Sequence, residues 1–232
     1  MIYRELPREE FEDLASRILY EDNHLLVVNK RSGEIVQGDK TGDEPLSEKY
    51  KAFIAQRDAK PGQVFMGLPH RLDRPVSGIT MLAKTSKALE RLNAMFRDSD
   101  VHKFYWAMVC SAPQPSEGHL EDMMWRNEKQ NKSYICRPGA TRKDAKLAKL
   151  SYKYIGKTDR YFLLLVFLGR KQYTGTGTIA IYGTSLTART PCFYIEAVHQ
   201  FFVYIVRKVD GRTDGVVYPL LDAALHLHLH QP

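Results

Sequence analysis

The sequence predicts an α+β fold in which a mixed, mostly antiparallel sheet is flanked by helices. Two kinds of pattern lead to this class. Apolar runs rich in β-branched and aromatic residues lie on either side of short turns, which is typical of antiparallel strands. Other segments repeat apolar residues at helical spacing. A chain of 232 residues is long enough for one substantial domain and short for two.

The first third of the chain predicts a strand pair between two helices. The expected elements are, in order, a short amphipathic helix or a tail at 7–17, strands at 18–20 and 25–29 around a turn, a Gly- and Asp-rich loop at 31–45, and a helix at 46–56. In the last of these, Leu46, Tyr50 and Phe53 fall on one stripe, so that this face of the helix is expected to be buried.

The middle of the chain continues the alternation. The expected elements are a buried strand at 79–83, a helix capped at Thr85-Ser86 and buried through Leu89, Leu92, Met95 and Phe96, a strand at 103–109, a polar and loop-rich stretch at 113–147, and a β-hairpin formed by 150–155 and 161–168. Seven lysines or arginines lie between Arg126 and Lys146, which is compatible with a solvated surface or with a flap that contacts phosphates.

One turn-prone segment carries an unusual group of charges. Asp73 lies between Arg71 and Arg74, next to His70, in the stretch 69–78. Guanidinium groups favour the ionised form of a nearby carboxyl, so Asp73 is a candidate nucleophile rather than a general acid. The alternative is a solvated Arg/Asp loop without chemistry, which is the commoner outcome for such a short pattern.

The same segment resembles the active-site signature of the RluA-type RNA pseudouridine synthases. The residues that carry the resemblance are His70-Arg71-Leu72-Asp73-Arg74-Pro75-Val76-Ser77-Gly78, with Val76 where the family usually has Thr or Ser. Three further segments are similar to family motifs: the strand pair 18–30, Lys30-Arg31-Ser32-Gly33 in place of Lys-Pro-x-Gly, and the strand 103–109. The resemblance covers about residues 18–170.

The resemblance implies the isomerisation of uridine to pseudouridine within RNA, without a metal or another cofactor. Asp73 takes the place of the family's nucleophile, and Arg170 is what remains of the later basic residue that the family pairs with it. Tyr105 matches the aromatic residue that stacks on the extruded uracil, although plain core packing explains it equally well. Arg71 would fill the gap left by the base or bind phosphate, and His70 would be structural or contact RNA.

Composition agrees with a basic, cytoplasmic, RNA-binding protein. The formal net charge is +7 and the pI is about 9.2, so the chain attracts polyanions such as RNA. The three cysteines form no C-x-x-C pair, which favours a reducing cytoplasm over a disulfide or zinc framework. We find neither an apolar run of roughly 20 residues nor an N-terminal signal core, and expect a monomer without membrane or obligate protein partner.

The resemblance ends after Arg170. We therefore divide the chain into an N-terminal extension at 1–17, a catalytic domain at 18–170 and a divergent segment at 171–232. The last 64 residues hold 10 charged side chains, against 51 in the first 168, and the family's x-His-Gln-Ile-Arg text is missing. Our preferred hypothesis is a shift of reading frame near Lys171, and the alternative is true divergence.

Other functions stay open on the sequence alone. One is an RNA-binding relative that has lost catalysis, and another is a carboxylate-dependent glycosidase, which would need a second acidic residue. His226, His228 and His230 alternate near the C-terminus, but no carboxylate or cysteine completes a metal site with them, so a tail without metal is the expectation.

Overall fold

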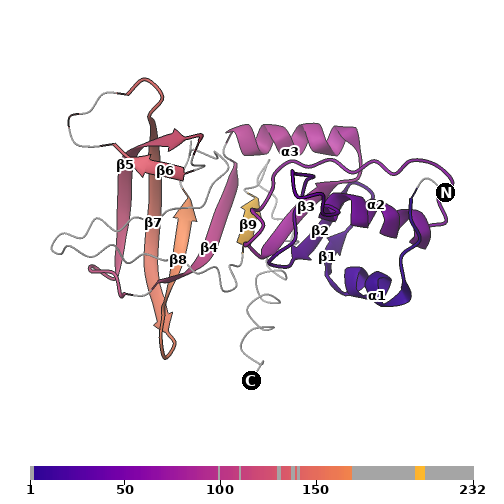
Figure 1. The fold of residues 1–232 in the computed structure, drawn as a ribbon, viewed down its shortest axis with the longest axis horizontal. Helices are drawn as coiled ribbons and strands as arrows, with labels where there is room; N and C mark the ends of the chain where they lie inside the picture. The colour runs from indigo at the N-terminus through magenta and orange to yellow at the C-terminus, as the bar shows by residue number, and fades with distance from the viewer. Residues whose placement is uncertain are drawn as a thin grey trace, which may run out of the picture. The chain divides into compact units, whose positions relative to one another are not determined.

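The computed structural model describes residues 3–98, 100–109, 111–129, 132–136, 139, 142–168 and 202–206, with only the backbone of His102, Lys132, Leu168 and 202–206. The described residues divide into two compact units, one formed by those up to Val101 together with 203–206, and the other by those from His102 to Phe202. Helices and antiparallel sheets are both present, which confirms the α+β class (Figure 1).

The first unit combines three helices with a small antiparallel sheet. Its elements are α1 (Arg8–Ser16), β1 (Ile18–Glu21), β2 (Leu25–Lys30), α2 (Leu46–Arg57), β3 (Gly78–Ala83) and α3 (Ser86–Asp98). The strand order is β1-β2-β3, so β3 forms one edge of the sheet. Val28 pairs with Ile18 on one side and with Thr80 on the other. The helices and strands expected in this region are confirmed, and residues 8–16 form a helix.

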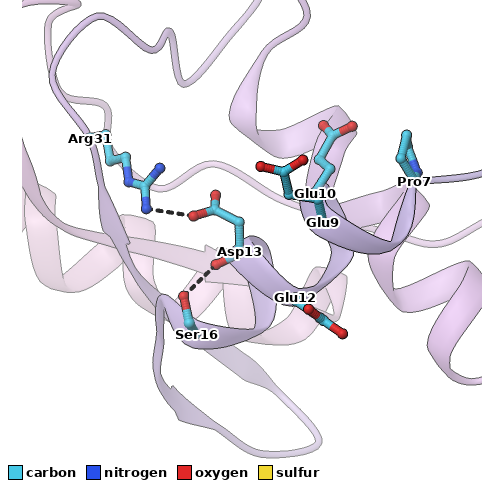
Figure 2. Close-up of a pocket in the computed structure, with 7 residues that line it drawn as sticks. All are labelled: Pro7, Glu9, Glu10, Glu12, Asp13, Ser16 and Arg31. Carbon is cyan, nitrogen blue, oxygen red and sulfur yellow. Dashed lines mark hydrogen bonds and ion pairs between the residues drawn. The ribbon is translucent and has the colours of Figure 1, made fainter.

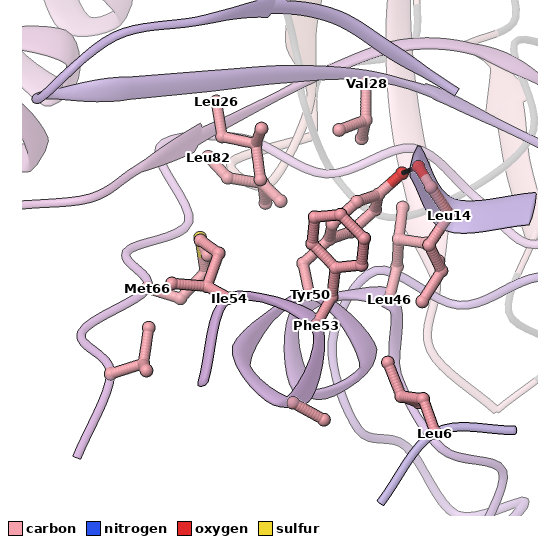
Figure 3. Close-up of a cluster of buried hydrophobic side chains, with 12 residues drawn as sticks. Leu6, Leu14, Leu26, Val28, Leu46, Tyr50, Phe53, Ile54, Met66 and Leu82 are labelled. Atoms are coloured by element: carbon pink, nitrogen blue, oxygen red, sulfur yellow. Dashed lines mark hydrogen bonds between the residues drawn. The ribbon is translucent and has the colours of Figure 1, made fainter. Parts of the chain in front are cut away.

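An apolar cluster of helix and strand residues stabilises this unit. Tyr50 and Phe53 of α2 lie against the sheet residues Leu26 and Leu82, all of them fully buried (Figure 3). Leu14 of α1 is part of the same cluster, and its carbonyl oxygen accepts a hydrogen bond of 3.0 Å from the Tyr50 hydroxyl. Burying a side chain of this size contributes about 1.5–3 kcal/mol, so α1 is anchored by packing rather than held at the surface.

The second unit is dominated by one antiparallel sheet. Its strands are β4 (Val101–Val109), β5 (Glu117–Asn127), β6 (Lys132–Ile135), β7 (Lys146–Lys157) and β8 (Phe162–Leu168), in the order β6-β5-β7-β8-β4. A further short strand, β9 (Phe202–Val206), belongs almost entirely to the first unit. The predicted hairpin is confirmed as β7 and β8, which pair from Leu150–Leu168 to Lys157–Phe162.

The expectation of a loop-rich stretch at 113–147 is wrong, because β5 and β6 occupy much of it. None of the β5 side chains is buried, so the apolar alternation that marks a strand in sequence is weak there. Pairing with β7 instead brings opposite charges face to face, as in Lys149 and Glu121, whose Nζ and Oε2 atoms lie 2.7 Å apart. Within the described residues, no helix is both long and apolar enough to cross a membrane.

Candidate active site

Asp73 lies in a tight turn just before the edge strand β3. The Val76 N–H donates a hydrogen bond of 3.0 Å to the carbonyl oxygen of Asp73, which closes the turn around Pro75. Leu72, the residue before Asp73, is buried and fixes the entry to the turn. The turn therefore presents Asp73 from a short loop with a packed residue on one side and a strand on the other.

A buried lysine holds the carbonyl oxygens of this turn. Lys30 ends β2 and is completely buried. Its ammonium nitrogen lies 3.1 Å from the carbonyl oxygen of Asp73, 3.2 Å from that of Arg74 and 2.5 Å from that of Val76. It also lies 3.1 Å from the carbonyl oxygen of Arg31. The three protons of the ammonium are thus shared among four backbone carbonyl oxygens. The buried ammonium of Lys30 thus fixes the backbone conformation around Asp73.

Burial sets the electrostatics of this lysine. Loss of solvent lowers the pKa of Lys30 to about 8, while the negative charges of Glu34 and Asp73 act in the opposite direction. At neutral pH Lys30 is therefore mainly protonated, a positive group whose ammonium contacts the carbonyl oxygens of the Asp73 turn. In the sequence, a lysine at the end of an apolar strand within a Lys-x-x-Gly motif indicates such a role. From the sequence alone, Lys30 is assigned no function.

The residues after Lys30 fasten the turn a second time. The Gly33 N–H donates to the Arg74 carbonyl oxygen at 2.8 Å, and the Ser32 hydroxyl donates to that of Pro75 at 2.9 Å. Gly33 has a φ of +90°, a conformation that side chains other than glycine rarely adopt. Substitution of Gly33 would consequently disturb the contact with Arg74.

Helix α1 is connected to the same segment through charges. Glu34 accepts hydrogen bonds from the Arg31 N–H at 2.9 Å and from Arg17 Nη1 at 2.8 Å. Arg17 is nearly buried and also pairs with Asp13 of α1 at 3.1 Å. Asp13 and Arg31 in turn lie 2.5 Å apart in a pocket lined mainly by carboxylates of α1 (Figure 2). That pocket does not include Asp73 among its lining residues.

His70 supports the edge of β3. Its Nε2 accepts a hydrogen bond of 2.9 Å from the Met81 N–H, and its ring stacks on Phe96 of α3 with centroids 5.1 Å apart. Acceptance at Nε2 requires a neutral imidazole that carries its proton on Nδ1. Two residues after Met81 on β3, Ala83 forms an isolated antiparallel bridge with Gly67. These contacts favour the structural alternative for His70.

The two arginines beside Asp73 do not serve it as the sequence led us to expect. Arg74 Nη2 lies 2.6 Å from the Thr41 hydroxyl and 2.5 Å from an Asp43 carboxylate oxygen. Arg71 is exposed. Across the described ranges, neither arginine forms an ion pair with Asp73, and Arg74 pairs instead with Asp39 and Asp43.

The remaining site residues predicted from sequence lie in or beyond the second unit. Tyr105 is buried on β4 and pairs with Val166 of β8. Arg170 falls outside the described residues, as do His226, His228 and His230. Among the residues that the structure does describe, no cluster of three or more His, Cys, Asp or Glu side chains is arranged to hold a metal ion.

The α+β fold and the lysine-braced turn that carries Asp73 agree with the family resemblance seen in the sequence. The profile of the family described as RNA pseudouridylate synthase matches residues 24–173, which is more than half of the chain. The chain belongs to this family, and the resemblance inferred from its motifs is confirmed.

Individual relatives agree with this assignment. Ribosomal large subunit pseudouridine synthase C of Vibrio parahaemolyticus is 42% identical over 116 residues, which are 50% of this chain and 35% of that protein. The protein of the same name from Buchnera aphidicola (subspecies Schizaphis graminum) is 29% identical over 209 residues, covering 90% of this chain and 58% of the relative. The chain thus spans about a third of the length of the Vibrio relative.

A solved structure shows the same fold. Human RNA pseudouridylate synthase domain containing 4 superposes with a TM-score of 0.56 at 22% sequence identity, over 68% of this chain and 60% of that one. At this identity the similarity establishes the fold alone, and it agrees with the α+β class predicted from sequence.

Proposed function

We propose that this protein isomerises specific uridines to pseudouridine in structured RNA, with Asp73 as the nucleophile. One observation supports the proposal: Asp73 lies within the family match at residues 24–173, on a turn whose carbonyl oxygens are held by the buried Lys30 at 2.5–3.2 Å. The names of the bacterial relatives favour ribosomal RNA as the substrate, and transfer RNA is the second candidate.

The isomerisation of uridine to pseudouridine requires one anionic group close to the sugar or the base. The bond between N1 and C1′ breaks, C5 bonds to C1′, and the proton of C5 is replaced by one on N1. Atoms and electrons balance within the nucleoside, so the reaction calls for no redox cofactor. The Asp73 carboxylate would attack the ribose or the ring, or stabilise charge at C1′. A braced turn keeps that carboxylate in place while the base rotates.

Other side chains are proposed to bind the RNA. Tyr105 would stack on the extruded uracil, Arg71 would fill the vacated place or contact phosphate, and Arg170 would pair with Asp73. The basic residues from Arg126 to Lys146 would contribute phosphate contacts, which need no base recognition. We further propose that the protein acts as a monomer in the cytoplasm and requires no metal.

Tritium release tests the proposal directly. Transcripts of ribosomal RNA and of transfer RNA carrying tritium at C5 of uridine are incubated with the full chain and with its Asp73→Asn variant. Release that depends on Asp73, from one transcript class, supports the proposal and selects the substrate. Absence of release from every transcript, under conditions where the protein binds RNA, would support the non-catalytic alternative.

The glycosidase alternative has weaker support. Such enzymes use two carboxyl groups, roughly 5–10 Å apart, on either side of the scissile bond. The charged group that contacts the Asp73 turn is instead the ammonium of Lys30, 3.1 Å from the Asp73 carbonyl oxygen. Release of free uracil from the transcripts, without pseudouridine, would reverse this preference.

A further inference from the structure

The loop of residues 39–43 forms an acidic cap on Arg74. Asp43 lies 2.5 Å from Arg74 Nη2, the Thr41 hydroxyl lies 2.6 Å from it, and Asp39 lies 3.8 Å from it. Asp39 accepts hydrogen bonds from the Thr41 N–H at 2.8 Å and from the Thr41 hydroxyl. The acidic cap is therefore a preformed loop rather than a chance encounter of long side chains.

The side chain and the backbone of Arg74 are held in different ways. Its carbonyl oxygen is bound by Lys30 at 3.2 Å and by Gly33 at 2.8 Å, in the part of the turn that is fixed from inside. Its guanidinium is at the surface, with 38% of the side chain exposed, against 57% for Asp43. Because exposed ion pairs contribute little net stability, the guanidinium can exchange partners while the turn stays in place.

The position of Arg74 specifies what the new partner would be. Arg74 follows Asp73 directly in the chain, and consecutive Cα atoms are about 3.8 Å apart. In the proposed reaction the Asp73 carboxylate must reach the ribose of the target nucleotide, so the side chain of Arg74 originates close to that ribose. The phosphates that flank this ribose are the anions nearest to it. A guanidinium binds phosphate through two parallel hydrogen bonds, which a surface carboxylate replaces imperfectly.

We propose that Arg74 is an RNA-binding residue that the acidic cap covers in the RNA-free protein. When RNA docks, the guanidinium leaves Asp43 and Thr41 for a phosphate beside the target uridine. The carboxylates of the acidic cap repel RNA that does not offer a phosphate at this point, so the cap adds selectivity to the site. This inference rests on the proposed function, since it takes RNA as the ligand.

A thermodynamic cycle tests the exchange. Binding of a fluorescein-labelled RNA stem-loop with a uridine-rich loop is measured by anisotropy, as a function of salt, for the full chain and three variants. Arg74→Gln is expected to weaken binding about fivefold to tenfold and to reduce the salt slope by about 0.7–0.9, the loss of one phosphate contact. Asp43→Asn is expected to tighten binding about threefold in the wild-type background and by less than about twofold in the Arg74→Gln background.

Two controls separate the cap from general charge effects and from misfolding. Glu12→Gln breaks an exposed pair with Arg8, in which the atoms lie 2.7 Å apart, and is expected to leave affinity unchanged. Arg74→Lys keeps the charge but not the paired hydrogen bonds, so it should preserve the salt slope and lose part of the affinity. Thermal unfolding of each variant checks that the fold is retained.

The outcomes are distinct. If Asp43→Asn has the same effect with and without Arg74, the carboxylate acts by long-range charge alone and the cap proposal is overturned. If Arg74→Gln leaves affinity and salt slope unchanged while wild type binds RNA and releases tritium, the cap fails and the proposed function stands. If wild type shows no salt-dependent RNA binding, both fail.

Discussion

The ammonium of Lys30 lies 3.1 Å from the carbonyl oxygen of Asp73, although the two residues are 43 positions apart in the chain. A buried cation at the end of one strand thus sets the backbone of the turn that carries the candidate nucleophile. Removing a water-inaccessible donor leaves its acceptors unsatisfied, which is costly in a low-dielectric interior. The geometry of Asp73 therefore depends on Lys30 more directly than on either neighbouring arginine.

Substitution of Lys30 by methionine should impair catalysis beyond its effect on folding. Methionine keeps most of the volume but donates no hydrogen bond to the carbonyl oxygens of Asp73, Arg74 and Val76. We expect the free energy of unfolding to fall by about 1–3 kcal/mol or more, the cost of a buried acceptor left unpaired. Tritium release per folded molecule should fall by about 100-fold, because the Asp73 carboxylate would no longer be held in a fixed position.

Lys84→Met is the matched control for this substitution. Lys84 also donates to a carbonyl oxygen, that of Asp22 at 2.7 Å, and pairs with Glu21, so that among the described residues its ammonium serves the β1–β2 turn rather than the Asp73 turn. It should lower stability while leaving activity per folded molecule near wild type. Equal losses of activity in the two variants would contradict a specific role of Lys30.

The pH dependence should separate activity from stability. The pKa of Lys30 is lowered by burial to about 8, below its unfolded value of 10.5. As pH rises through about 8 the folded protein loses this proton and one donor to the turn, so activity should decline. Between about pH 8 and 10.5 the unfolded chain binds the proton more tightly, so the contribution of Lys30 to the unfolding free energy rises with pH.

Tritium release and urea unfolding across pH 7–10 would measure both trends. Lys30→Met supplies the reference, because it lacks the titrating group and should lose this part of the alkaline decline. An identical alkaline decline in wild type and in Lys30→Met would assign the titration to another group.

Asp73→Asn should abolish isomerisation and spare RNA binding. The amide cannot act as a nucleophile, whereas the phosphate contacts that dominate affinity are unchanged, so binding should stay within about tenfold. Asp98→Asn serves as a control, because Asp98 is an exposed residue of α3 that pairs with the exposed Arg97 at 3.2 Å. Substantial tritium release by Asp73→Asn would exclude Asp73 as the nucleophile.

His70 should matter to stability through the hydrogen bond that it accepts from the Met81 N–H. His70→Phe preserves an aromatic ring beside Phe96 but leaves the Met81 N–H without its acceptor, which should cost about 1–3 kcal/mol. Urea unfolding of wild type and of His70→Phe measures this difference, and equal unfolding free energies would argue that the hydrogen bond contributes little.

The sequence predicted most of the first unit because its strands and helices bury apolar residues at regular spacing. Leu26 and Val28 on β2, and Tyr50 and Phe53 on α2, are buried as their patterns indicate. Strand β5 was missed because its pairing depends on partners across the sheet rather than on its own alternation. The partners of Arg74 were also unpredictable, since they come from a loop 31–35 residues earlier whose path only the fold determines.

The C-terminal segment offers the last prediction, on a region that falls almost wholly outside the described residues. Strands β4 and β8 bury one face through Tyr105, Ala107, Val109, Leu164 and Val166. Their other face carries Phe104, Trp106, Met108, Leu163, Leu165 and Phe167, which are all only half-buried. Apolar surface of this kind needs a cover, and exposed it promotes association.

If the reading frame shifts near Lys171, a chain with the restored frame should supply that cover. It should melt at a higher temperature and release tritium faster than the chain as written, which should tend to aggregate. Comparing the two by thermal unfolding, light scattering and tritium release tests this, and translation of the other two frames beyond Gly169 tests the premise. A sharp cooperative transition with full activity in the chain as written would mean that residues 171–232 complete the fold by a divergent route.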